Sequence, residues 1–138
     1  PELPDHAEAG TQNVCGICGL AAGLRFVQQQ TPQRLLAHEV RQRKLLTSLL
    51  TDVPGVRLFT GEPQSGTLSL CAAQMDCETL AARLAVKGVC VRAGLHCAPL
   101  AHESAGTLET GTVRFSLSAF NTEQEIFRTA DLLKEILA

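Results

Sequence analysis

Residues 56–72, VRLFTGEPQSGTLSLCA, decide how the fold is interpreted. Residues 56–60 and 67–72 carry the apolar, β-branched and aromatic side chains that are typical of strands, and we expect the second strand to be the more buried. The six residues between them include two glycines and a proline, which predict a turn. Because strands joined by a short turn run in opposite directions, this stretch predicts an antiparallel pair of strands.

The segments on either side complete the domain. Upstream, the spacing of apolar residues predicts a helix over 13–30, and Thr31-Pro32 begins a second helix that ends near residue 52. Downstream, the sequence first predicts a helix over 77–87, a strand over 89–92 and a long loop over 94–111. A strand over 112–117 follows, and a final helix opens at the capping box Thr122-x-x-Glu125. One antiparallel sheet with its helices on one face is an α+β fold.

The composition is that of an ordinary globular domain. The chain has 138 residues, of which 45% are hydrophobic and 19% are charged, so it is long enough to bury a core. Its net charge is −2 and it contains neither Tyr nor Trp, so we expect no binding to nucleic acid or to an anionic membrane. It has no run of about 18 apolar residues, so we expect no membrane span. Because the start, PELPDH, lacks Met, we expect a piece of a longer protein.

Six cysteines stand at positions 15, 18, 71, 77, 90 and 97. The polar N-terminus is no signal peptide, so we expect reduced thiols in a cytoplasmic protein, most of them small buried residues. Cys15-x-x-Cys18 is compatible with zinc if His96 and Cys97 are further ligands, but this spacing fits no standard zinc finger. We therefore predict no metal site and keep a Cys/His zinc-binding module as an alternative.

The densest group of reactive side chains is RAGLHCAPL, residues 92–100. A cysteine becomes nucleophilic where a nearby cation stabilises its thiolate, and Arg92 and His96 are placed to do so for Cys97. The alternative is that Cys97 is a buried loop thiol and Arg92 a surface charge. Arg114, in the middle of a predicted strand, either lies on the solvent face or binds a carboxylate or phosphate through its planar guanidinium.

Two further features are open to more than one interpretation. Gly10 and Thr11 precede a predicted helix, where backbone N–H groups and a hydroxyl can hold a phosphate, although the same residues can simply cap the helix. His102, five residues after Cys97, is either scaffolding of the loop or a contact behind the reactive residues.

Three segments together resemble the class V aminotransferases. Residues 8–13, EAGTQN, followed by GI at 16–17 and GL at 19–20, resemble that family's E-A-G-T-P-N…G-I…G-L segment, with Gln12 in place of the usual proline. Residues 92–99, RAGLHCAP, resemble the R-x-G-x-H-C-A segment of cysteine desulfurases and selenocysteine lyases. GTVRFS, at 111–116, and FNT, at 120–122, resemble their R-x-S…Y/F-N-T segment.

The resemblance implies the small C-terminal domain of a fold-type I enzyme that depends on pyridoxal phosphate. It implies a cysteine desulfurase, which removes sulfur from L-cysteine to give alanine and a persulfide on a cysteine of the protein. The site residues that it implies are Cys97 and His96 for catalysis, Arg114 and Arg92 for substrate binding, and Gly10 and Thr11, which reach across a homodimer to the cofactor phosphate.

The same resemblance implies that the large, cofactor-bearing domain is missing. The family's cofactor-binding lysine lies upstream of the EAGT segment, and Lys44, Lys87 and Lys134 match no such motif. We expect residues 1–30 to be a lead-in segment and interdomain helix, residues 31–138 to be the small domain, and the chain alone to be inactive. The family implies a sulfur-acceptor protein as partner and a role in iron–sulfur cluster assembly. A selenocysteine lyase or a class V aminotransferase is the alternative activity.

Overall fold

The computed structural model describes residue 7 and residues 10–138. The chain separates into two compact units, residues 1–35 and residues 36–138. Glu8 and Ala9, which belong to the first of the three family-like segments, lie outside the described residues. Within the described part of the chain, no helix is long and apolar enough to cross a membrane.

The first unit contains α1 (Val14–Gln30), the helix that the apolar spacing predicts. Asn13 begins it, because its side-chain oxygen accepts a hydrogen bond from the backbone N–H of Gly16 at 3.0 Å. Thr31 ends it with a left-handed backbone, φ 63°, just before the next helix starts. None of the residues of α1 is buried.

All six thiols are free, and the expectation that most of them are buried is wrong. Four are exposed, Cys15, Cys18, Cys90 and Cys97, and two are half-buried, Cys71 and Cys77. The physical reason is their placement: the first two lie on a helix that buries nothing, and Cys90 and Cys97 lie in connections outside the strands.

The second unit is built on a four-stranded antiparallel sheet in the order β1-β2-β4-β3. Its strands are β1 (Val56–Phe59), β2 (Thr67–Ala72), β3 (Arg92–Gly94) and β4 (Thr112–Ser116). β1 and β2 form the predicted antiparallel pair, with Leu58 opposite Leu70. β2 also pairs with β4, which places Leu70 opposite Val113, and the short β3 pairs with the other side of β4.

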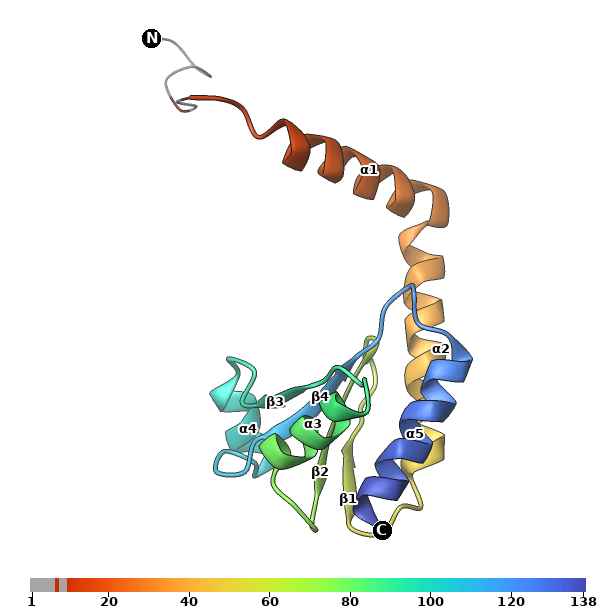
Figure 1. The fold of residues 1–138 in the computed structure, drawn as a ribbon, viewed down its shortest axis with the longest axis vertical. Helices are drawn as coiled ribbons and strands as arrows, with labels where there is room; N and C mark the ends of the chain where they lie inside the picture. The colour runs from red at the N-terminus through yellow and green to blue at the C-terminus, as the bar shows by residue number, and fades with distance from the viewer. Residues whose placement is uncertain (1–6, 8–9) are drawn as a thin grey trace. The chain divides into compact units, whose positions relative to one another are not determined.

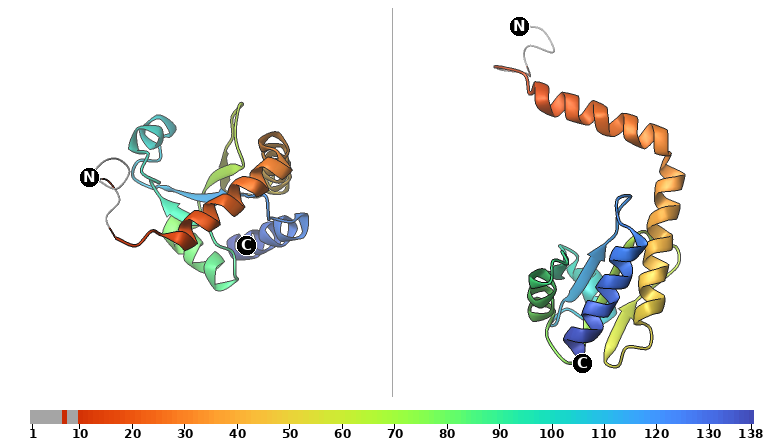
Figure 2. Two further views of the ribbon diagram at one scale, coloured as in Figure 1. Left: turned by 90° about the horizontal axis from the view of Figure 1, so that it is seen from above. Right: turned by 45° about the vertical axis from the view of Figure 1, so that its right-hand side comes forward.

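Three helices pack on one face of this sheet and close the core (Figures 1 and 2). They are α2 (Pro32–Leu50), α3 (Cys77–Val86) and α5 (Glu123–Leu137). Their apolar residues meet the inward-facing residues of β2 and β4 in a core of Leu46, Leu50, Leu68, Leu70, Leu80, Leu84, Val113, Phe115, Ile126, Ala130, Leu133 and Leu137. Burying one such large side chain stabilises the fold by about 1.5–3 kcal/mol. The predicted α+β fold is confirmed.

The structure differs from the prediction between residues 89 and 111. β3 begins at Arg92 rather than at residue 89, and the predicted loop contains a further helix, α4 (Pro99–Ala105). Proline fits the first turn of a helix, where no N–H is needed, and Gly106 ends α4 with a left-handed backbone, φ 67°. A helix of seven residues shows too little periodicity to be recognised in a sequence. In the view from above, α4 lies across the sheet from α3 and α5 (Figure 2).

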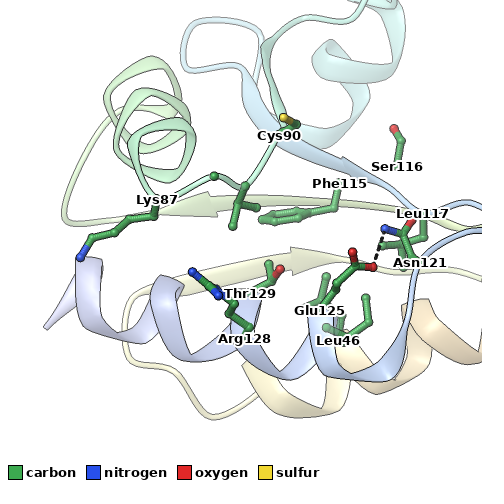
Figure 3. A pocket seen from close by; sticks show the side chains of 13 residues that line it. Leu46, Lys87, Cys90, Phe115, Ser116, Leu117, Asn121, Glu125, Arg128 and Thr129 are labelled. Carbon is green, nitrogen blue, oxygen red and sulfur yellow. Dashed lines mark hydrogen bonds between the residues drawn. The ribbon is translucent and has the colours of Figure 1, made fainter.

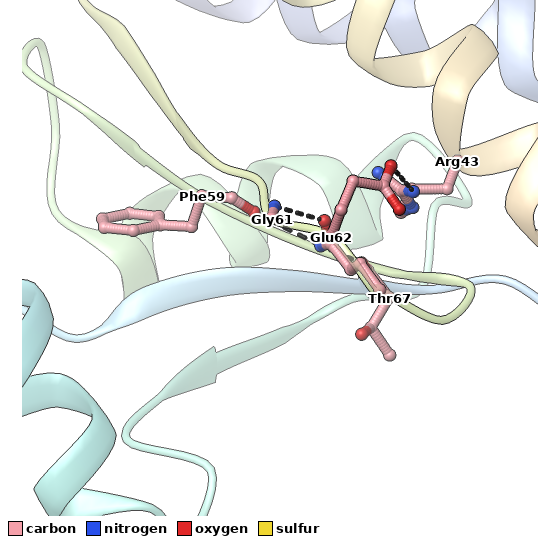
Figure 4. A network of polar contacts seen from close by, with 6 residues as sticks. Arg43, Phe59, Gly61, Glu62 and Thr67 are labelled. Carbon is pink, nitrogen blue, oxygen red and sulfur yellow. Dashed lines mark hydrogen bonds and ion pairs between the residues drawn. The ribbon is translucent and has the colours of Figure 1, made fainter.

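Side chains hold the turn between β1 and β2 (Figure 4). The side-chain amide of Gln64 donates hydrogen bonds to the carbonyl oxygens of Phe59 at 3.3 Å and Thr67 at 2.8 Å. The guanidinium of Arg43, whose side chain is only 3% exposed, lies 3.6 Å from the carboxylate of Glu62. These contacts fix the register of the hairpin and attach it to α2.

We expect Gly111→Ala to destabilise the chain more than Gly106→Ala does. Both glycines have left-handed backbones, with φ of 61° and 67°, so either alanine costs about 1–2 kcal/mol of backbone preference. A Cβ on Gly111 would also lie 3.0 Å from Cα of Gly94 and 3.1 Å from Sγ of Cys77, whereas nothing lies within 4 Å of one on Gly106. This crowding should remove about 2 kcal/mol more from the free energy of unfolding, measured in urea. Equal losses in the two variants would contradict it.

Candidate functional site

The face of the sheet that points away from the core carries the predicted site. Side chains alternate along a strand, so Arg114, between two core residues of β4, points to the opposite face. Its direct neighbours across the strands are Ser69 on β2 and Arg92 on β3. α4 lies over the same face, where Nη2 of Arg57 donates to the carbonyl of Ala105 at 3.1 Å. Two arginines therefore lie side by side on the face that α4 partly covers.

Cys97 lies in the tight turn between β3 and α4. His96 and Cys97 are consecutive residues with left-handed backbones, φ 53° and 59°. For residues other than glycine this conformation costs on the order of 1–3 kcal/mol each, so surrounding contacts must hold it. The N–H of Ala98 donates to the carbonyl of Leu95 at 2.9 Å and closes the turn. Cys97 itself is exposed, so the alternative of a buried loop thiol is wrong.

The half-buried ring of His96 lies against β4. Its Nε2 is 3.1 Å from Oγ1 of Thr112, the first residue of that strand. Burial holds the pKa of His96 below its ordinary value, and the positive charges around it, Arg114 first, lower the pKa further. His96 is therefore neutral near pH 7, and it is not the cation beside Cys97 that the sequence predicts.

Arg92 and Arg114 are like charges on neighbouring strands. Arg114 is half-buried and donates from Nε to Oγ of Ser116 at 3.2 Å, while Arg92 is exposed. Like charges directly opposite each other destabilise a sheet. Among the residues that the structure describes, no carboxylate forms an ion pair with either arginine. Since a guanidinium matches a carboxylate in shape and charge, the pair is suited to a carboxylate-bearing ligand.

Gly10 and Thr11, the predicted phosphate-binding residues, lie in the first unit just before α1. Gly10 has a left-handed backbone, φ 89°, with nothing within 4 Å of the position of a Cβ, and Thr11 is exposed. Asn13 caps α1, so the hydroxyl of Thr11 is not needed for that task. An open glycine and an available hydroxyl fit a phosphate group. These two residues belong to a different unit from the other predicted site residues.

The zinc alternative lacks a ligand set in residue 7 and residues 10–138. No three Cys, His, Asp or Glu side chains come together there in a way that would hold a metal ion. A structural zinc ion needs four ligands.

Two threonines that the sequence analysis does not single out contact the histidines. Thr112 contacts His96, and Oγ1 of Thr107 lies 2.8 Å from Nδ1 of His102. Both threonines are 3% exposed. The sequence does contain a signal for Thr112: it lies two residues before Arg114 in a predicted strand, so the two side chains are expected on the same face of the sheet. Thr107 carries no such signal, since its loop has no regular spacing.

A cavity of about 450 Å³ opens elsewhere on the second unit (Figure 3). It is lined by residues 87–90, by the end of β4 and by α5, with Leu46 and Phe115 contributing apolar surface. Cys90 lines this cavity, whereas Cys97 does not. The predicted site therefore does not coincide with this cavity, and it remains a prediction that rests on its charged residues and its left-handed turn.

Lowering the pH should destabilise the chain through His96. Because its pKa is lower in the folded than in the unfolded chain, the unfolded chain takes up the proton first as the pH falls. The contribution of His96 to the free energy of unfolding is therefore complete above about pH 6.5 and is lost as the pH falls from there. His96→Gln, whose amide can still reach Thr112 but does not titrate, should flatten the profile of urea unfolding between about pH 7.5 and pH 5.5. An unchanged profile would contradict the lowered pKa.

Comparison with known proteins places this chain in one family. The chain matches the family model described as aminotransferase class-V over residues 1–128. It belongs to the class-V aminotransferase family, as the three sequence segments indicate.

Within that family, the chain is similar to proteins named as cysteine desulfurases. It is 34% identical over 139 residues to a probable cysteine desulfurase of Methanothermobacter thermautotrophicus, with 98% of this chain and 34% of that protein covered. It is 39% identical over 124 residues to a probable cysteine desulfurase of Mycolicibacterium paratuberculosis, with 89% of this chain and 18% of that protein covered. The chain thus spans about a third or less of the length of these relatives.

Solved structures of cysteine desulfurases share the fold. The apo structure of the enzyme from Thermococcus onnurineus NA1 is 28% identical and superposes with a TM-score of 0.85, covering 99% of this chain and 34% of that one. The cysteine desulfurase CsdA from Escherichia coli, in an S-sulfonic acid form, is also 28% identical, with a TM-score of 0.81 over 95% of this chain and 33% of that one. The predicted class of fold, part of a fold-type I enzyme, is confirmed.

Proposed function

We propose that this chain is the small C-terminal domain of a cysteine desulfurase, with residues 1–30 as its lead-in segment and interdomain helix. The complete enzyme would remove sulfur from L-cysteine, leaving alanine and a persulfide on Cys97. The observation that carries the proposal is that Arg92 and Arg114 lie on neighbouring strands with no carboxylate of the described residues paired to either of them. The exposed turn at Cys97 directly follows the strand of Arg92. The names of the relatives support it, and they favour a desulfurase over a selenocysteine lyase or an aminotransferase.

Pyridoxal phosphate is the cofactor that we propose for the complete enzyme. When bound, it would stabilise negative charge at the carbon that the substrate sulfur leaves. Gly10 and Thr11 would hold its phosphate, and in a homodimer that cofactor would be the one bound to the partner. Of the lysines in this chain, Lys87 forms a surface ion pair with Glu135 at 2.9 Å. We propose that the covalent attachment of the cofactor lies in the part of the relatives' length that this chain does not span.

Arg114 and Arg92 would bind the carboxylate of L-cysteine. Arg114 is fixed in the middle of β4 and already uses Nε on Ser116, which leaves its terminal nitrogens to form the two-pronged contact with a carboxylate. Arg92, on the exposed side, adds charge that draws an anion to the same face. This clamp would set the direction in which the substrate sulfur points.

Cys97 would accept the sulfur. Its thiolate attacks the sulfur of the bound cysteine, so a new S–S bond forms while the C–S bond breaks. The electron pair of the broken bond stays on carbon, which takes up a proton to become the methyl group of alanine. Neutral His96 donates from Nε2 to Thr112 in one tautomer, which leaves its Nδ1 without a proton. That nitrogen is buried and has no partner among the described residues, the Cys97 thiol included, so the turn would have to move in the complete enzyme for Nδ1 to take up the thiol proton. A thiolate of an acceptor protein would then attack the outer sulfur of this persulfide and take it over, and Cys97 would leave as a thiolate again.

In the 138-residue chain, Cys97 should be the first thiol to react with limiting iodoacetamide. Three other thiols are exposed, so access does not decide the order. Cys97 stands in an exposed, tight turn directly after the arginine-bearing strand β3, whereas Cys15 and Cys18 lie on a regular helix. Peptide mass spectrometry at partial labelling would measure the order, with exposed Cys90 as the internal reference. Preferential labelling of Cys15 or Cys18 would contradict the assignment of Cys97 as the nucleophile.

A further inference from the structure

His102 is buried although it lies on a short surface helix. It stands in the middle of α4, five residues after Cys97, and is 7% exposed. Its Nδ1 lies 2.8 Å from the hydroxyl of Thr107, which is itself 3% exposed. A buried imidazole and a buried hydroxyl that satisfy each other in this way have a defined orientation.

The ring of His102 lies beside the ring of His96. The two ring centroids are 5.8 Å apart and the planes are tilted by 48°. Since Nε2 of His96 contacts Thr112, a continuous series of contacts runs from Thr107 through both histidines to β4. It joins the helix that follows Cys97 to the strand that carries the arginine clamp.

Polar contacts, rather than close packing, hold α4 on this part of the sheet. A small cavity of about 150 Å³ lies between α4 and the sheet. It is lined by His102, Thr107 and Thr112 together with Phe59, Ser69 and two alanines of α4. With space beneath the helix, the hydrogen bond of His102 and that of Arg57 to the last residue of α4 determine where the helix sits.

The strained turn at Cys97 needs contacts from its surroundings that keep it in place. His96 and Cys97 both keep left-handed backbones, which persist only where the surroundings hold them. We infer that His102 is a positioning residue: held by Thr107, its ring braces the ring of His96 on Thr112 and so fixes the turn that presents Cys97. The brace itself is a property of this chain, and its consequence for sulfur transfer rests on the proposed function.

Thr107→Val tests the brace, with Thr107→Ser as its matched control. Valine keeps the shape of threonine but removes the hydroxyl, whereas serine keeps the hydroxyl and restores the hydrogen bond. The experiment records imidazole ¹H–¹⁵N correlation spectra of the whole ¹⁵N-labelled chain, which report the tautomer of each histidine. We expect His96 to occupy one tautomer in the wild-type and Thr107→Ser chains and to populate both in Thr107→Val. His102→Leu, which keeps bulk without a hydrogen bond, should resemble Thr107→Val.

The result that would overturn the inference is a Thr107→Val chain with a lower Tm but with the wild-type tautomer of His96. His102 would then be a structural residue of α4 only. In the complete enzyme, Thr107→Val should lower kcat by about tenfold with little change in KM, because the clamp on the substrate is untouched. If the tautomer changes and kcat does not, the brace stands and the role of His96 in the proposed function is wrong.

Discussion

Cys97→Ala in the complete enzyme should abolish the release of sulfur from L-cysteine while leaving the substrate able to bind. The sulfur of Cys97 is one partner in the S–S bond that must form, and a methyl group cannot replace it. We expect a loss of at least about a thousandfold in kcat, or about 4 kcal/mol. Sulfide production in the presence of a thiol reductant and alanine formation would measure the loss. Calorimetric titration with L-cysteine should give an affinity near that of the wild type.

Cys90→Ala is the matched control for this variant. Cys90 is also an exposed thiol of the second unit, but it lines the cavity of Figure 3 rather than the site. Its replacement should leave sulfide production unchanged. Wild-type sulfide production by Cys97→Ala, with loss of activity in Cys90→Ala, would reassign the nucleophile to Cys90.

The main elements of the fold can be predicted from the sequence because their signals are local. The strands around 56–72 alternate and are separated by a glycine- and proline-rich turn, and the capping box at Thr122 marks the start of α5. α4 escapes prediction because seven residues complete only two turns. The valines at 89 and 91 suggest a strand that starts at residue 89, but β3 starts at Arg92 because its pairing with β4 begins only there.

The site is predictable in its residue types but not in its charges. The sequence singles out Cys97, His96 and Arg114 as candidates by their residue types and their order along the chain. It cannot show that His96 is half-buried among positive charges, because Arg114 comes near it only when β4 pairs with β3. The protonation state of His96 is therefore a property of the fold. The exposure of Cys90 is likewise a property of the fold, because β3 begins at Arg92 and Cys90 therefore lies in the connection before the strand.

Arg114→Lys in the complete enzyme should lower kcat/KM for L-cysteine by one to three orders of magnitude, which is about 1.4–4 kcal/mol. Lysine keeps the positive charge but loses the planar fork that orients a carboxylate, so the substrate sulfur would no longer point reliably at Cys97. The fold should change little, because Arg114 is only half-buried and makes a single hydrogen bond, to Ser116, in the described structure. Steady-state kinetics and the Tm of the same preparation would measure both effects.

Arg57→Lys separates a clamp from a structural arginine. Arg57 lies on the same face of the sheet, but it stacks on Phe59 with its guanidinium carbon 4.7 Å from the ring centroid and donates to the carbonyl of Ala105. Its replacement should lower Tm and leave kcat/KM largely intact, the reverse of the pattern for Arg114→Lys. If Arg114→Lys also lowers Tm while its kinetics stay at the wild-type level, Arg114 is a strand residue that supports α4 and the turn. The carboxylate of L-cysteine would then be bound elsewhere in the complete enzyme, although the chain would still belong to its family.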